Sequence, residues 1–267
     1  MKILVADGYN LLYRARTGWG QGDNPIVFNF LRSFKALVEK FNPDKTYFVL
    51  EGRPKKRKDL LPEYKAQRVY SDHDDFYRQK NLCIDFVKNW LPVDVIRHED
   101  HECDDVIGYL ANVKHSNDEC IVISSDTDFI QLLSTDNDRI QLYNPIRKKF
   151  IEAPSYDYVE WKALTGDKSD NIPGFDRVGP KTAEKLITDQ EKLEKFLSIE
   201  DRLARFKMNV QLIKFEDVDG SRLEVDRGIY DSKAIKGIFE SMKFDSMLNE
   251  KYWNNFERVF TNGTKHV

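Results

Sequence analysis

The sequence lacks the features that mark secreted, membrane-spanning and disordered chains. It has only three cysteines, an odd number set among apolar or acidic neighbours, so we expect reduced thiols and no disulfide framework. No apolar run approaches the roughly 20 residues that a membrane helix needs. The first residues reach a charge at Asp7 too soon for a signal peptide and are typical of a strand. We therefore expect a cytoplasmic protein with no membrane partner.

The chain also carries little net charge, −3, which by itself disfavours a nucleic-acid partner, but the charges are unevenly distributed. Residues 53–68 hold seven basic side chains and two acids. Acids gather instead in compact groups at 99–105, 126–128 and 167–170. A chain of this kind is suited to bind a polyanion through the basic segment and metal ions through the acidic groups.

Hydrophobic periodicity predicts strands that alternate with helices over the first 150 residues. The predicted strands are 2–6, 45–50, 93–97, 119–124 and 139–143, and the predicted helices are 25–41, 72–90, 104–113 and 126–133. Strands and helices that alternate with short loops indicate an α/β fold with a mostly parallel sheet covered on both faces. Residues 53–70 show no clean period, and this basic segment is interpreted as either a helix or an arch.

The pattern changes after about residue 150. Short helices are predicted at 155–164, 180–187, 191–197, 199–215 and 232–244, with Gly and Pro between them. We therefore predict an α/β core at 1–150, a helical subdomain at 151–250 and an aromatic tail at 251–267. The tail is interpreted first as a segment that docks on the body of the protein, and second as a contact for other proteins.

Acidic residues follow four of the predicted strands. They are Asp7, Glu51, the group Glu102, Asp104 and Asp105, and the pair Asp126 and Asp128. The carboxyl ends of parallel strands lie at one edge of the sheet, where open α/β folds place their sites. Two carboxylates about 4 Å apart repel by roughly 4 kcal/mol at an effective dielectric constant near 20, so the group needs protons or cations.

An all-oxygen ligand set favours Mg²⁺ or Mn²⁺, and two such ions can hydrolyse a phosphodiester. Any one of these acids could instead be an ordinary helix cap or turn residue. Four strand ends that all carry acids are much harder to explain in this way. A zinc site at 98–103 is a weaker alternative because the spacing matches no usual zinc pattern, and Cys103 is better interpreted as a small buried residue.

Two further segments are suited to bind phosphates. In 172–183, Gly174 and Gly179 bracket a tight loop and Pro180 opens a helix with Lys181 and Thr182 in its first turn. The alternative is an ordinary connection between two helices. In the basic segment, the aromatic ring of Tyr64 could stack on a base, and Lys65 and Arg68 could hold a scissile phosphate. The alternative there is a solvated basic helix. Further candidate nucleic-acid contacts are Arg53, Lys55, Lys56 and Arg57.

Several stretches together resemble the 5′-nuclease family, which includes the N-terminal domain of bacterial DNA polymerase I, phage 5′-exonucleases and flap endonucleases. The matching stretches are residues 7–14, 64–68, 102–105, 125–128, 164–174 and 179–183, in the order and approximate spacing of the family. They span about residues 1–250. No single stretch would be specific, but the set is.

The resemblance implies two metal sites. Asp7, Glu51, Glu102 and Asp104 would line the first, and Asp126, Asp128 and Asp170 the second, with Asp105 and Asp167 as supporting acids. It also implies that 172–183 is the helix–hairpin–helix part of a helix–three-turn–helix, which binds duplex phosphates, often with K⁺. Residues 53–80 would form the arch, with Lys65 and Arg68 at the cleavage site. The family usually has Asp where this chain has Glu51, which can still bind a metal but could shift its position.

We therefore expect a structure-specific 5′–3′ exonuclease or flap endonuclease that acts by two-metal catalysis in DNA replication or repair. The expected partners are DNA with a 5′ flap, nick or gap, and RNA–DNA hybrids, with replication proteins as partners of the aromatic tail. The expected location is the bacterial cytoplasm or nucleoid, or a phage-infected cell. Two alternatives stay open, namely a non-catalytic structure-specific DNA-binding protein and a PIN-type RNA nuclease.

Overall fold

A mixed sheet of seven strands lies at the centre of the computed structural model, which describes residues 1–67 and 74–262. The strands are β1 (Lys2–Asp7), β2 (Lys45–Val49), β3 (Asp94–Arg97), β4 (Glu119–Ile123), β5 (Ile140–Asn144), β6 (Lys149–Ile151) and β7 (Glu224–Arg227). They lie in the order β6-β5-β4-β1-β2-β3-β7. Neighbours from β5 to β3 pair in parallel, whereas the edge strands β6 and β7 pair antiparallel. The predicted α/β fold with a mostly parallel sheet is confirmed.

Both faces of the sheet are covered, because apolar side chains alternate along the strands. In β1, Leu4 and Ala6 join one hydrophobic cluster, and Ile3 and Val5 join another on the opposite face. Against the first face pack α1 (Gly8–Ala15), α2 (Pro25–Phe41), α4 (Asp74–Trp90), α10 (Ser232–Ser241), α11 (Asp245–Leu248) and α12 (Glu250–Asn262). Against the second pack α5 (Cys103–Tyr109), its π-helical continuation Leu110–Lys114, and a 3₁₀ helix at Asp128–Leu132.

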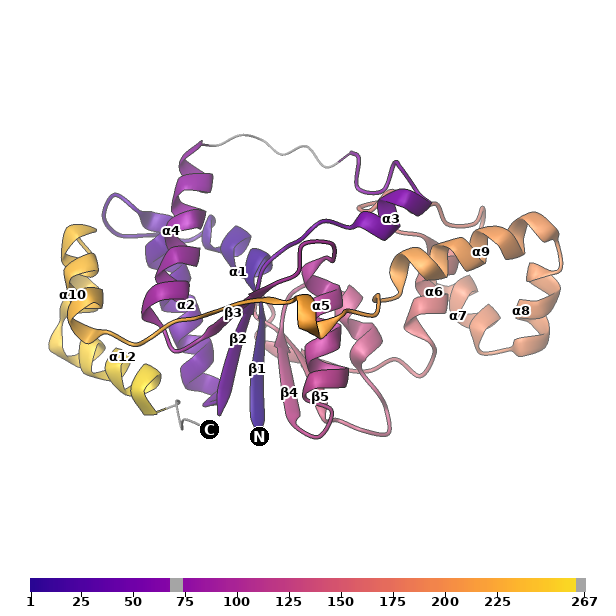
Figure 1. Cartoon of the computed structure of the whole chain (residues 1–267). Helices are drawn as coiled ribbons and strands as arrows, with labels where there is room; N and C mark the ends of the chain where they lie inside the picture. The colour runs from indigo at the N-terminus through magenta and orange to yellow at the C-terminus, as the bar shows by residue number, and fades with distance from the viewer. Residues whose placement is uncertain (68–73, 263–267) are drawn as a thin grey trace.

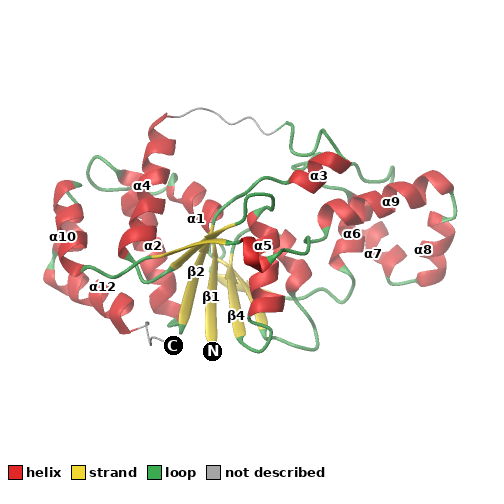
Figure 2. Cartoon of the chain, in the orientation of Figure 1, coloured by secondary structure: helices red, strands yellow, loops and turns green. Residues whose placement is uncertain are grey.

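A separate group of helices extends from the α5 side of the sheet (Figure 1, Figure 2). It consists of α6 (Tyr158–Thr165), α7 (Pro180–Ile187), α8 (Gln190–Leu197) and α9 (Glu200–Ile213), which enclose a third hydrophobic cluster. We call this group the helical lobe. The short helix α3 (Lys55–Leu60), from the basic segment, lies above α9 and α5 in Figure 1 and joins the lobe to the core.

The last part of the chain does not follow the predicted division, which assigned residues 151–250 to one helical subdomain. After α9 the chain runs back past α5 to the opposite end of the molecule (Figure 1). There β7 pairs with β3, and α10 to α12 bury Phe239, Trp253 and Phe256 against the helices of the first face. Residues 224–262 therefore belong to the core and not to the helical subdomain. Trp253, Phe256 and Phe260 of the aromatic tail are buried, as the docking interpretation expects, and residues 263–267 lie outside the described residues.

Within the described ranges, no helix is long and apolar enough to cross a membrane.

Candidate metal centre

A first group of acids lies where β1 and β2 end and α5 begins. Asp7 ends β1 and caps α1, since its Oδ1 accepts a hydrogen bond from the Asn10 amide at 3.0 Å and its Oδ2 accepts one from Ser124 Oγ at 2.8 Å. Glu51 follows β2 and accepts from the Cys103 amide at 3.3 Å. Parallel strands with short connections thus bring residues far apart in the sequence to one edge of the sheet, as expected.

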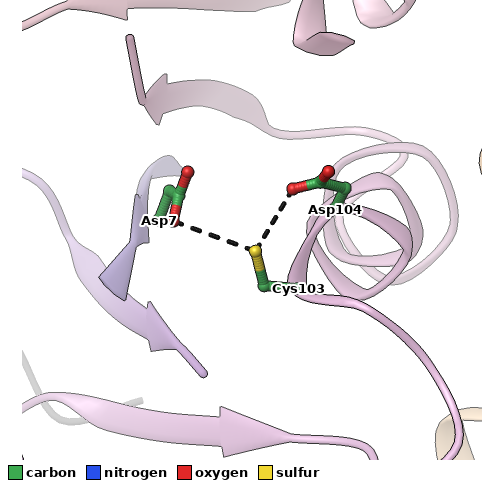
Figure 3. Close-up of side chains that lie close together, drawn as sticks. All are labelled: Asp7, Cys103 and Asp104. Atoms are coloured by element: carbon green, nitrogen blue, oxygen red, sulfur yellow. Dashed lines mark hydrogen bonds between the residues drawn. The ribbon is translucent and has the colours of Figure 1, made fainter. Parts of the chain in front are cut away.

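Cys103 lies between two of these acids (Figure 3). Its Sγ is 3.8 Å from Asp7 Oδ1 and 3.2 Å from Asp104 Oδ1. The thiol is buried, and burial first of all, followed by the nearby carboxylates, raises its pKa well above the usual value. The interpretation of Cys103 as a small buried residue agrees with this exposure, but the close contact with two acids was not expected.

A second group of acids comes from the loop after β4 and the loop between α6 and α7. One carboxylate oxygen from each of Asp128, Asp167 and Asp170 lies within 4.8 Å of the others. Gly166, with φ of 75°, turns the chain after α6, and Gly174 packs so closely that a Cβ would lie 2.2 Å from the Thr165 carbonyl oxygen. Side chains of both groups, among them Glu102, Asp104 and Asp170, line one small pocket. Asp126 is exposed beside it.

Four acids in and around this pocket have raised pKa values, whereas the burial of Asp167 is outweighed by hydrogen bonds from Lys162 and Ser169, which lower its pKa. Burial raises the pKa of Asp7 to about 6, and the charge on Asp126 adds to the effect. Burial and the neighbouring Glu102 raise the pKa of Glu51 to about 7. Burial also raises the pKa of Asp128 to about 6, although Lys162 opposes this change. The pKa of Asp104 is raised as well, because of burial and then Glu51. A group of buried oxygens that resists carrying its full negative charge fits divalent cations well.

Two lysines supply positive charge inside the pocket. Lys65 is bonded to Glu102 Oε1, and its Nζ lies 3.6 Å from Asp170 Oδ2. Its backbone amide donates to the Asp170 carbonyl oxygen at 3.1 Å, and this hydrogen bond joins the basic segment to the lobe. Lys162 is bonded to Asp128 and lies 2.6 Å from Asp167 Oδ2. The sequence analysis missed Lys162. The sequence did contain a signal for its burial, because Lys162 lies beside three apolar residues in a short helix. The structure buries the positions that follow it in this helix.

Arg57 and Tyr64 are buried against carboxylates and are not exposed on the surface. Arg57 is only 3% exposed; its Nη1 and Nη2 donate to the two oxygens of Asp105 at 2.7 Å each, and Nη1 donates to Glu102 at 2.8 Å. Tyr64 is also 3% exposed, and its hydroxyl oxygen lies 3.0 Å from Glu102 Oε2 and 3.2 Å from Asp170 Oδ2, so that its one proton is shared between two acceptors. Buried carboxylates need hydrogen-bond donors, which explains why both side chains point inward. Their roles as DNA contacts stay predictions.

Asp105 has a structural role in this arrangement. Burial alone would raise the pKa of its carboxyl group, but contacts from His101 and Arg57 lower it to about 2. Asp105 Oδ2 also accepts a hydrogen bond from the Glu102 amide at 3.1 Å, which completes a capping box at the start of α5. Asp105 therefore orients Glu102.

The remaining candidate contacts lie on the surface. Arg53 is exposed just before α3, and Lys55 and Lys56 are exposed at its start. Gly179, Lys181 and Thr182 are exposed at the start of α7 in the lobe. Gly174 is half-buried against Thr165. Arg68 lies outside the described residues, as does part of the predicted arch.

Comparison with known proteins identifies the class to which this fold and site belong. Residues 2–162 match the N-terminal resolvase-like domain of 5′-3′ exonucleases, and residues 153–220 match the C-terminal SAM fold of 5′-3′ exonucleases. The chain belongs to the 5′-3′ exonuclease family, so the predicted resemblance is confirmed. The first acidic group and Asp128 of the candidate metal centre lie in the part that matches the first domain, and Asp167 and Asp170 lie in the part that matches the second.

Individual relatives agree with this assignment. The chain is 28% identical to the 5′-3′ exonuclease of Aquifex aeolicus over 94% of this chain and 95% of that protein. It is 30% identical to the thermostable DNA polymerase I of Thermus aquaticus over 93% of this chain, but it spans only 33% of that protein's length.

Solved structures share the fold. The bacteriophage T5 flap endonuclease, in a complex with DNA and metal ions, superposes with a TM-score of 0.66 at 18% identity and covers 97% of this chain and 99% of that one. Human GEN1, in complex with Holliday junction DNA, superposes with a TM-score of 0.59 at 14% identity and covers 98% of this chain and 72% of that one.

Proposed function

We propose that this chain is a divalent-metal-dependent 5′ nuclease that hydrolyses phosphodiesters near the 5′ ends of flaps, nicks and RNA primers. The observation that carries the proposal is the pocket lined by acids from both groups, in a chain of the 5′-3′ exonuclease family. The DNA and metal ions bound to the T5 flap endonuclease support the same substrate class. Bacterial and phage relatives support a place in the bacterial cytoplasm or nucleoid, or in a phage-infected cell.

The ligands that we propose form two sets. Asp7, Glu51, Glu102 and Asp104 would hold one Mg²⁺ or Mn²⁺, and Asp126, Asp128 and Asp170 a second, with Asp167 and Asp105 in support. When bound, these ions supply an activated water and stabilise charge on the leaving oxygen. The oxygen-only carboxylate set and its resistance to full ionisation support this assignment.

The basic side chains have separate proposed roles. Lys65, held at the pocket by Glu102 and Asp170, is placed to neutralise the scissile phosphate. Arg68 is proposed for the same task on the basis of the family resemblance. The exposed Arg53, Lys55 and Lys56 would contact a single strand, and Gly174, Gly179, Lys181 and Thr182 would contact duplex phosphates, together with a K⁺ ion.

A cleavage assay with four substrates tests the proposal. The protein is incubated with 5′-flap DNA, nicked DNA, a 5′-RNA/DNA hybrid and single-stranded RNA, each with Mg²⁺ and with EDTA. We expect Mg²⁺-dependent cleavage near the 5′ end of the DNA-containing substrates, with a 5′-phosphate product. Binding of flap DNA without cleavage would favour the non-catalytic alternative, and cleavage of single-stranded RNA alone would favour the PIN-type RNA nuclease.

The variant Asp128→Ala separates catalysis from binding. It removes one proposed ligand but leaves the exposed basic surface unchanged, so cleavage should be lost while flap binding is largely retained. Lys65→Ala should slow single-turnover cleavage more than it weakens binding. The exposed Lys168→Ala, in the same loop as Asp167 and Asp170, is a matched control that should change neither strongly.

A further inference from the structure

A third group of metal-binding side chains lies outside the proposed catalytic pocket. It consists of His101 before α5, Asp105 within α5, and Glu216 in the segment that follows α9, and one ligand atom from each lies within 4.8 Å of the others. In Figure 1 this segment passes directly beside α5 on its way from the lobe back to the sheet. The Glu216 amide donates to Asp105 Oδ1 at 2.8 Å, which holds the segment in place.

Two atoms of the group are buried without hydrogen-bond partners. They are His101 Nδ1, in a residue only 7% exposed, and Glu216 Oε2. Buried polar atoms are normally satisfied, and one left unpaired destabilises the folded state. Both atoms face each other across 3.4 Å, and His101 Nδ1 lies 3.8 Å from Asp105 Oδ2.

These distances are long for a hydrogen bond, but they match the distances between two ligand atoms that bind the same metal ion. An N–H···O bond to a protonated imidazole would bring the heavy atoms to roughly 2.7–3.2 Å. Ligands around a tetrahedral Zn²⁺, with bonds of about 2.0–2.1 Å, lie about 3.3 Å apart. One imidazole nitrogen and two carboxylates form a ligand set typical of zinc and similar transition metals, and not of Mg²⁺.

We propose that His101, Asp105 and Glu216 bind a transition-metal ion of the Zn²⁺ or Co²⁺ class, separate from the catalytic ions. A water molecule completes the fourth position. Two neighbouring cations adjust to it: Lys56 Nζ, 3.3 Å from Glu216 Oε2, is on a largely exposed side chain that can move away. Arg57 keeps its bond from Nη2 to Asp105 Oδ1 and its bond from Nη1 to Glu102, but its 2.7 Å bond from Nη1 to Asp105 Oδ2 is replaced by the metal. The metal clamps the segment after α9 onto the start of α5.

Cobalt distinguishes this site from the catalytic pocket. Excess Mg²⁺ is added first to occupy the oxygen-only sites, and Co²⁺ is then titrated into the full-length protein. Four-coordinate Co²⁺ with an imidazole ligand absorbs strongly in the visible range, whereas six-coordinate Co²⁺ among oxygen ligands absorbs weakly. We expect strong visible bands that saturate at one equivalent and disappear when Zn²⁺ is added. Cobalt bound at Cys103 would instead add a sulfur charge-transfer band in the near ultraviolet.

Three variants decide the proposal. His101→Phe and Glu216→Gln should each lose the visible bands or weaken Co²⁺ binding by about tenfold or more. Glu224→Gln, at the start of β7 and exposed, is the matched control and should behave as wild type. Circular dichroism checks that each variant is folded, and Glu216→Gln decides alone if His101→Phe is not. Absence of strong bands in the wild type, or bands that Glu216→Gln leaves unchanged, would overturn the proposal.

Discussion

Asp7 shows how a single acid of the metal centre opposes folding when no cation is bound. Burial raises its pKa from 3.8 to about 6, and a tenfold change in proton affinity corresponds to about 1.4 kcal/mol. Asp7→Asn keeps one oxygen that can accept the bond from the Asn10 amide, and its new amide nitrogen can donate to Ser124 Oγ. We expect the variant to be more stable than the wild type by about 1–3 kcal/mol in EDTA at about pH 7.5. Urea unfolding measures the difference, with the exposed Asp136→Asn as the control.

The raised pKa of Asp7 also predicts a pH dependence with a definite sign. A folded-state pKa above the unfolded value means that the folded protein binds the proton more tightly, so stability falls as pH rises from about 4 to about 6. The advantage of Asp7→Asn over the wild type should therefore grow over this window and level off above it. Unfolding curves in EDTA across this window and above it test this. An advantage that shrinks as pH rises would contradict the raised pKa.

Lys162 balances the second group of acids in the absence of metal. Its ammonium contacts Asp128 and Asp167 at a position only 9% exposed. Removing one partner of a buried ion pair typically destabilises by about 3–5 kcal/mol. Lys162→Met should therefore lower stability in EDTA by about 3 kcal/mol, and Mg²⁺ should raise its melting temperature by more than it raises that of the wild type. Lys168→Met, at an exposed position in the loop that carries Asp167, is the control and should show neither effect.

The sequence indicated where the acidic side chains lie better than where the basic side chains lie. Acids at strand ends are visible in the sequence, because parallel strands bring their carboxyl ends to one edge whatever the details of packing. A basic segment predicts an exposed surface, whereas Arg57 and Tyr64 donate hydrogen bonds to buried carboxylates. That choice depends on distances that only the folded chain defines. The roles of the individual metal ligands stay predictions.

At the scale of elements, the buried side chain of α3 joins this helix to two others. Arg57 connects it to α5 through Asp105 and to the end of α9 through the Leu212 carbonyl oxygen at 2.8 Å. Arg57→Met would leave the Asp105 charge buried without its partner. We expect a loss of about 3–5 kcal/mol in stability, together with slower cleavage because Glu102 loses a donor. Chemical denaturation and a flap-cleavage assay measure the two effects.

The neighbouring Lys58→Met is the matched control for Arg57→Met, because Lys58 is exposed on the same helix. It should leave both stability and cleavage close to wild type. Equal behaviour of the two variants would show that Arg57 is an ordinary surface cation in solution.

Long periodic elements were predicted closely and short ones were not. The predicted helices at 25–41 and 180–187 agree with α2 and α7 residue for residue. The edge strands β6 and β7 were missed, since β6 has three residues and β7 reads Glu-Val-Asp-Arg with no buried face. Edge strands of this kind form by pairing with a neighbour already in the sheet, so their own sequence carries little signal.

At the scale of the whole molecule, the chain crosses the metal centre twice. It passes once from the sheet into the lobe and once on its return, where Glu216 packs against Asp105. The predicted division into a core, a helical subdomain and a tail does not include this return, because local periodicity predicts α10 as a helix but says nothing of where it or the aromatic tail packs. The sheet, the lobe and the terminal helices therefore form a structure in which the last residues stabilise the first.

Phe256 tests this dependence on the terminal helix. It is fully buried and its ring packs against Phe239, Trp253 and Phe260. Phe256→Ala should reduce the free energy of unfolding by about 3–5 kcal/mol, as expected for a large ring removed from a packed core. Asn254→Ala, on the exposed side of α12, should change it little. If α12 were instead a loosely attached tail, Phe256→Ala would leave the unfolding midpoint of the core unchanged, and the metal centre would keep its thermal stability.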